Sequence, residues 1–145
     1  MKLNPRNEVS YRARLAIRYL EEAEEAYKRG DYRGTVASSQ LSAENAAKAI
    51  IALFRTPSWS HDPSYELIDV LPLLPVDLRS LTQELAEITR RLAPEHGRVT
   101  YGEPLRGLTP WDLYDEESAS EVLLRARRAR EIMGIILSRL GDLRI

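Results

Sequence analysis

The chain has 145 residues, 43% of them hydrophobic and 30% charged, a balance typical of one globular domain and unlike a disordered segment. It contains no cysteine, which excludes disulfide bonds, thiolate metal sites and a cysteine nucleophile, and which suits a reducing, cytoplasmic location. The formal net charge of −1 gives the whole molecule no electrostatic attraction to nucleic acid, so any such binding must come from a local group of residues.

The first half of the chain predicts a helical hairpin. Apolar residues at three- and four-residue spacing indicate a first helix from about Glu8 to Arg29. Gly30 then ends that helix and Asp31 caps the next one, which runs from about Tyr32 to Arg55. Apolar and small residues surround most of this second helix, so we expect it to be central and largely buried.

The second half predicts three further helices and two loops. Two prolines and several capping residues make 56–64 a loop, after which a short helix spans about Tyr65 to Leu74. A fourth helix runs from Pro75 to Leu92, with proline at its first position. Residues 93–114 lack regular periodicity and predict a long surface loop, a kind of segment that often carries function. The last helix begins at the cap Asp115 and runs to Leu140.

These elements predict an all-α fold, an up-and-down bundle of about five helices that forms a single domain over residues 1–145. No segment alternates apolar and polar residues with period two, so no sheet is expected. We expect no membrane span, because no apolar run approaches 18 residues. We also expect no secretion by a signal peptide, because the first 15 residues lack its apolar stretch.

Polar residues of the second helix are candidates for a site. Glu44 and Lys48 stand four apart with the acid first, the orientation that favours an ion pair within a helix. If the pair lies at the margin of the buried face, it only stabilises the helix. A functional role requires a third polar partner, which Gln40 can supply.

The simplest role for His61 is a hydrogen bond from its ring to a backbone carbonyl of the loop, while Ser60 or Asp62 caps the following helix. The spacing of histidines and acidic residues predicts no metal site, and no glycine-rich phosphate loop is present, so no cofactor is expected.

Four segments of the chain carry a family resemblance through their order and spacing. They are Gly30-Asp31-Tyr32-Arg33, then Gln40-x3-Glu44-x3-Lys48-Ala49, then Ser60-His61-Asp62 followed by Leu67 and Leu71, and finally Val99–Glu103 ahead of Tyr114–Ala119. Together they resemble the HEPN domains (higher eukaryote and prokaryote nucleotide-binding) over nearly the whole chain. The resemblance implies a helical bundle, association with nucleotides or RNA, a homodimer, and a separately encoded nucleotidyltransferase as a partner.

Many HEPN proteins form a ribonuclease site in a dimer from an Arg and a His that are separated by four to six residues. In this chain Arg91, or Arg90 before it, and His96 match that pattern. His96 would take the proton of the 2′-hydroxyl, and Arg91 would stabilise the charged phosphate. Pro94 interrupts the backbone between them.

Two further observations argue against this motif. Arg55 precedes His61 by a similar gap, so both histidines match in a chain that contains 18 Arg. Leu92 also stands where the family motif usually has a small polar residue.

The favoured interpretation is a nucleotide- or RNA-binding module that lacks efficient catalysis. The loop around Arg98, Tyr101 and Glu103 would close over a cleft beside the second helix, with Arg98 binding a phosphate.

Two alternatives stay open. One is a metal-independent ribonuclease of the toxin type that uses Arg91 and His96. The other is a structural dimer that presents residues 93–114 to another protein. The candidate ligand-binding residues are Gln40, Glu44, Lys48, His61, Arg98, Tyr101 and Glu103. Apolar loop residues also favour a homodimer, namely Trp59, Leu105, Leu108 and Trp111.

Overall fold

The computed structural model describes residues 5–141, and within this range the fold is all-α, as predicted. Four long helices account for most of the described chain, and three short α-helices and two 3-10 helices connect them. In chain order the elements are α1 (Pro5–Lys28), α2 (Tyr32–Ile51), α3 (Ser64–Val70), η1 (Leu71–Leu73), α4 (Val76–Leu92), α5 (Glu95–Tyr101), η2 (Pro104–Arg106), α6 (Pro110–Leu113) and α7 (Glu116–Leu140). Among the described helices, none is long and apolar enough to cross a membrane.

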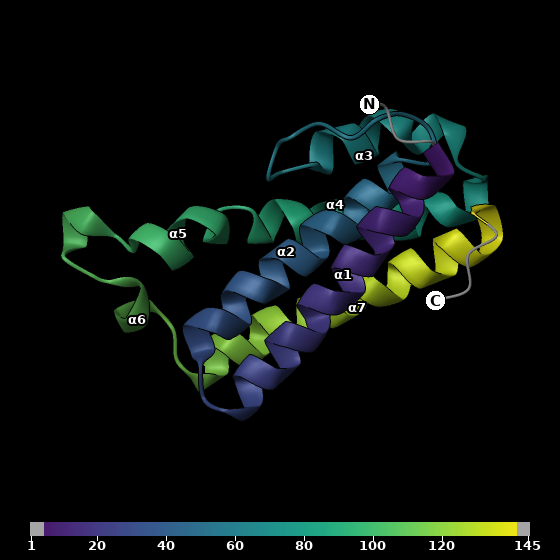
Figure 1. Cartoon of the computed structure of the whole chain (residues 1–145). Coiled ribbons are helices and arrows are strands. Elements are labelled where there is room, and N and C mark those ends of the chain that lie inside the picture. The colour runs from purple at the N-terminus through teal and green to yellow at the C-terminus, as the bar shows by residue number, and fades with distance from the viewer. Residues whose placement is uncertain (1–4, 142–145) are drawn as a thin grey trace.

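The α2 helix lies at the centre of the bundle, as its composition predicts. It packs against both α1 and α7, and these three helices run alongside one another (Figure 1). Its small residues Ala43, Ala46 and Ala47 are fully buried, which lets the neighbouring helices approach closely. Ser42 also donates a hydrogen bond from Oγ to the carbonyl of Ala16 in α1, at 2.7 Å. The hydrophobic core is therefore built around α2.

The turn between α1 and α2 has the predicted stop and cap. Gly30 adopts a positive φ of 78°, a conformation that favours glycine over residues with a side chain. The Asp31 carboxylate then accepts a hydrogen bond from the backbone N–H of Gly34 at 2.9 Å. These two residues turn the chain back on itself and start α2.

Two helices end earlier than their apolar patterns predict. The α2 helix ends at Ile51 instead of Arg55, because the N–H groups of Leu53 and Phe54 bond to carbonyls three residues back and tighten the last turn. The predicted helix over 65–74 is split into α3 and η1, since Pro72 has no N–H with which to continue the α-helical pattern. Periodicity alone does not report these local hydrogen bonds.

Residues 93–114 are more regular than their sequence predicts. They contain α5, η2 and α6, which form an arm (residues 95–113) that extends beside the start of α2 (Figure 1). Each helix of the arm is too short for a repeated apolar pattern to show. A single isolated bridge between Glu103 and Leu108 closes the arm, and among the described residues it is the only β-type pairing. Gly102 is required there, because a Cβ at its positive φ of 68° would lie 2.2 Å from the Leu108 carbonyl oxygen.

Candidate functional site

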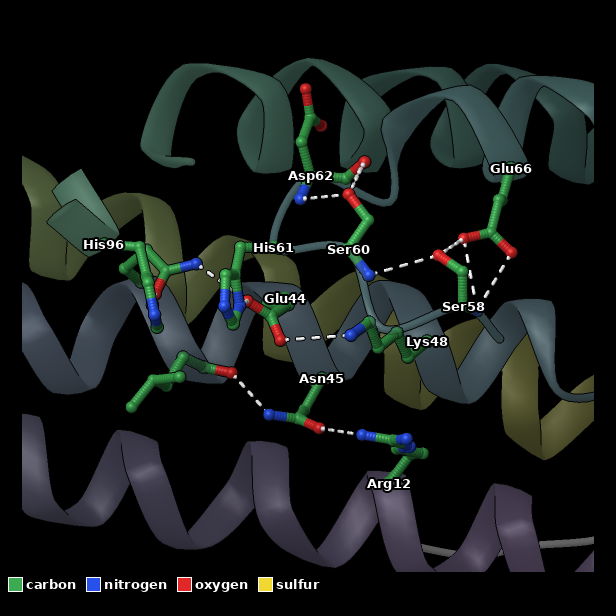
Figure 2. Close-up of polar contacts among 12 residues, drawn as sticks. Arg12, Glu44, Asn45, Lys48, Ser58, Ser60, His61, Asp62, Glu66 and His96 are labelled. Atoms are coloured by element: carbon green, nitrogen blue, oxygen red, sulfur yellow. Dashed lines mark hydrogen bonds and ion pairs between the residues drawn. The ribbon is translucent and has the colours of Figure 1, made fainter. Parts of the chain in front are cut away.

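A row of three polar side chains lies along one face of α2. Gln40, Glu44 and Lys48 occupy successive turns, and each is almost completely buried, with 6% of Glu44 and 3% of Lys48 exposed. Gln40 donates from Nε2 to Oε1 of Glu44 at 3.1 Å. Lys48 donates from Nζ to Oε2 of the same carboxylate at 3.2 Å (Figure 2). The pair is inside the protein and not at the margin of the buried face, and the third polar partner is present.

Both histidines of the chain converge on this row. His61 comes from the loop between α2 and α3, and His96 is the second residue of α5. His61 Nδ1 lies 3.0 Å from Glu44 Oε1, and His96 Nδ1 lies 3.0 Å from Gln40 Oε1. The two rings stack on each other, with centroids 3.6 Å apart and planes 19° from parallel, and lie side by side over α2 (Figure 2). We call these five residues, Gln40, Glu44, Lys48, His61 and His96, the α2 site.

The predicted role of His61 is wrong in one respect. Its ring bonds to the carboxylate of Glu44 and not to a backbone carbonyl, because the loop folds back over α2 and brings together residues 17 positions apart. The N-cap position of α3 is occupied by Pro63, which makes no side-chain cap hydrogen bond, so neither Ser60 nor Asp62 is the cap. Asp62 Oδ1 instead accepts a hydrogen bond from the N–H of Ser64, the first residue of α3, at 3.1 Å, and Ser60 Oγ accepts one from the N–H of Asp62 at 3.0 Å. These hydrogen bonds order the loop that carries His61.

The hydrogen bonds assign the protons of the two rings. A carboxylate only accepts, so His61 donates from Nδ1–H to Glu44. Gln40 turns its Nε2 toward the same carboxylate, so its Oε1 accepts from Nδ1–H of His96. Burial, followed by the neighbouring His61 ring, holds the pKa of His96 below its ordinary value. Near neutral pH His96 is therefore uncharged, with a free lone pair on Nε2.

Exposure decides which residues of the α2 site a ligand meets. The side chain of His61 is 53% exposed, whereas the Glu44 and Lys48 side chains beneath it are buried. A molecule from solvent therefore meets the imidazole rings, and the charged pair acts on it only from behind them.

Two of the predicted ligand-binding residues of the arm, Arg98 and Glu103, lie in a separate network. Arg98 forms ion pairs with Glu95 and, at 2.8 Å, with Glu103, while the Tyr114 hydroxyl donates to Glu95 at 2.6 Å. The Tyr101 side chain is 75% exposed. Arg98 and Glu103 hold the arm together, so an anion would have to displace a carboxylate to reach Arg98. Its predicted contact with phosphate stays a prediction.

The two residues of the ribonuclease motif face different parts of the protein. The backbone is interrupted as predicted, since α4 ends at Leu92 and α5 begins after Pro94. Arg91 lines a shallow hollow between α4 and α7 with Arg125, while His96 bonds to α2. Within residues 5–141, no hydrogen bond, ion pair or ring contact joins Arg91 to His96. In one chain these residues therefore do not form a shared site.

The contact between the two histidines is the feature that sequence reasoning missed. His61 and His96 are 35 positions apart and lie on different elements, so no spacing rule links them. The available signal was indirect: these are the only two histidines of the chain.

Comparison with known proteins gives one match. A family model described as HEPN domain matches residues 9–136, which is most of the chain and includes every residue of the α2 site. No curated protein and no solved structure matches the chain.

Proposed function

The chain belongs to the HEPN domain family, and from this premise we propose that it binds RNA or a nucleotide at the α2 site without cleaving it. The observation that carries this proposal is the stacked pair of imidazole rings at the surface of the site, held from behind by Gln40 and Glu44. The family supports a role with nucleotides or RNA, and the ring pair supports this location.

Stacking is the interaction that the α2 site offers to a base. Proteins bind unpaired bases by stacking them on aromatic side chains, histidine included. Each ring of the pair covers one face of the other, and the exposed His61 ring can continue the stack outward. Its hydrogen bond to the buried Glu44 holds the ring in place, so a base meets a platform that is already oriented.

The same geometry argues against cleavage. General acid–base cleavage of RNA requires a base at the 2′-hydroxyl and an acid at the leaving oxygen, with the reacting phosphate between them. The rings of His61 and His96 are in contact, with centroids 3.6 Å apart, which leaves no room for a phosphate between them. Arg91, the expected partner of His96, lies between α4 and α7.

Binding can be tested by fluorescence anisotropy with a labelled single-stranded RNA and with AMP as competitor. His61→Ala should weaken binding by about 1–3 kcal/mol if one base stacks on the ring, which is roughly 5- to 150-fold in Kd. His61→Phe keeps a flat ring and should retain most of the affinity. Arg18→Ala, which removes an exposed cation from the outer face of α1, is the matched control and should change little. Equal affinity of wild type and His61→Ala would overturn the proposal.

Catalysis needs its own test. Purified protein should leave single-stranded RNA intact when no metal is added. Degradation by the wild type that is lost in His96→Ala would instead establish the ribonuclease alternative.

We also propose a homodimer, supported by apolar side chains that the arm leaves exposed. Tyr101 and Trp111 are 75% and 72% exposed, and Leu105 is completely exposed. Burying them against a second copy would remove this apolar surface from water. Sedimentation at micromolar concentration should show a species larger than the 16.5 kDa chain. A pure monomer would exclude the homodimer, whereas the nucleotidyltransferase partner and the cytoplasmic location stay predictions.

A further inference from the structure

Three side chains of metal-binding type meet where the two histidine rings cover the buried carboxylate of Glu44. One ring nitrogen from each of His61 and His96 and one carboxylate oxygen of Glu44 all lie within 4.8 Å of one another. We propose that these three residues bind a divalent transition-metal ion of the Zn²⁺ type and leave one coordination position open. This inference goes beyond the binding of RNA or nucleotide and does not depend on it.

The donor set selects the class of metal. Two imidazoles and one carboxylate are ligands typical of Zn²⁺ sites that keep an open position, with bonds of about 2.0–2.2 Å. Such bonds place neighbouring ligand atoms roughly 3.2–3.6 Å apart in a tetrahedral arrangement, and His61 Nδ1 and Glu44 Oε1 are 3.0 Å apart. The ion would replace the hydrogen bond between these two atoms, so the His61 ring would carry its proton on Nε2 in the metal-bound state. Mg²⁺ and Ca²⁺ prefer sets of oxygen ligands, and a single carboxylate does not supply one.

Residues behind the ligands hold them in orientation. Lys48 donates from Nζ to Oε2 of Glu44, and Oε1 of the same carboxylate is directed toward His61. Gln40 accepts the Nδ1–H of His96, which fixes the tautomer and leaves Nε2 free to coordinate. Hydrogen bonds of this kind to the far side of a ligand are the usual support of a metal site.

Metal binding requires a small movement of the rings. The lone pair of an imidazole nitrogen lies in the plane of its ring, so two rings only 19° from parallel do not aim at one point. His61 lies in a loop and its side chain is 53% exposed, so its ring can tilt without disturbing the core. We therefore expect the stack to open when the ion binds.

The charge of the loaded site indicates what completes the coordination. The Glu44–Lys48 pair is neutral overall, so a divalent ion bound beside it would leave the site with two positive charges. The open position therefore suits an anionic ligand, and a phosphate oxygen is one such ligand.

The test is a calorimetric titration of the untagged 145-residue chain with Zn²⁺ in a buffer that does not bind metal. One ion should bind per chain, and His61→Ala and His96→Ala should each abolish binding at concentrations that saturate the wild type. Gln40→Ala removes the hydrogen bonds that support His96 and Glu44 but no ligand atom, and should weaken binding by about 10- to 100-fold. Asp69→Asn is the matched control, because Asp69 is an exposed acidic residue of α3 outside the donor set, and it should bind normally. Mg²⁺ at the same concentration should give no signal.

Nitrogen-15 spectra of the imidazole rings provide an independent reading. Because the chain has two histidines, two sets of ring signals are expected, and both should shift on addition of Zn²⁺. Ring signals that do not shift on addition of Zn²⁺ would overturn the proposed metal site. Zn²⁺ binding that persists in His61→Ala would overturn it as well. RNA binding that survives a chelator would show that the proposed function stands even if the metal site fails.

Discussion

The α2 site and the arm each pair a cation with carboxylates, but in different surroundings. In the α2 site, Lys48 and Glu44 are buried on a long helix at the centre of the bundle. In the arm, Arg98 of the short helix α5 pairs with Glu103, which directly precedes η2. The Arg98 side chain is 36% exposed and the Glu103 side chain 25% exposed. The interaction type is the same, and burial decides what each pair contributes.

Burial makes the α2 pair depend on both partners. A buried charge without its partner is strongly destabilising, whereas water replaces a lost partner at the surface. The buried pair of the α2 site therefore fixes the orientation of the histidines. The ion pairs of Arg98 mainly hold the backbone of the arm in its local conformation. Four measurements can break or sharpen this contrast.

The largest effect is expected for Lys48→Met, which removes the buried cation but keeps a chain of similar length. Glu44 is then left as a buried charge, which should lower the free energy of unfolding by about 3–5 kcal/mol. Urea denaturation measures the loss. The double variant with Glu44→Gln removes both charges and should recover most of it. A loss below about 1 kcal/mol, as at the surface, would show that the pair is hydrated.

The next effect tests the packing of α2. Ala47 is fully buried, and Ala47→Leu should overpack the helix contacts and cost about 1–3 kcal/mol. Thr100→Leu, at an exposed position of α5, adds a similar side chain to the arm and should stay within about 0.5 kcal/mol. Thermal unfolding of both variants provides the comparison. An unchanged melting temperature for Ala47→Leu would mean that the contacts of this face of α2 are not tightly packed.

A smaller effect concerns pH. The pKa of His96 is lower in the folded protein, so between that value and the unfolded value of about 6.5 the unfolded chain binds more protons. The stability that comes from neutral His96 is present above this window and is lost as the pH falls through it. Urea denaturation from pH 7.5 downward should show this fall in the wild type and less of it in His96→Gln. The same slope in both proteins would assign the pH dependence to other groups.

The smallest effect is expected in the arm. Arg106 pairs with Glu103 at 2.5 Å, but 70% of the Arg106 side chain is exposed. Arg106→Ala should therefore leave the urea midpoint almost unchanged, because water and salt already screen the pair. If its cost matched that of Lys48→Met, burial would not be the factor that separates the two regions.

The long helices were predictable because their determinants are local. The apolar stripes of α1, α4 and α7, the turn at Gly30 and the cap Asp115 all lie within a few residues of the features they specify. The elements of the arm were not predictable in this way. Helices as short as α5 and α6 contain too few turns to repeat a pattern, and the bridge at Glu103 depends on a residue further along the chain.

The candidate site also combines a feature that is local in the sequence with contacts between distant residues. The sequence by itself determined the row Gln40, Glu44 and Lys48, because a four-residue spacing on a helix places side chains on one face. Only the tertiary structure decided that this row is buried and that His61 and His96 stack above it. Those facts depend on how α5 and the loop before α3 fold over α2, and no local pattern encodes the contact between residues 35 positions apart. For that reason the spacing predicted no metal site, while the folded chain brings three possible ligands within 4.8 Å of one another.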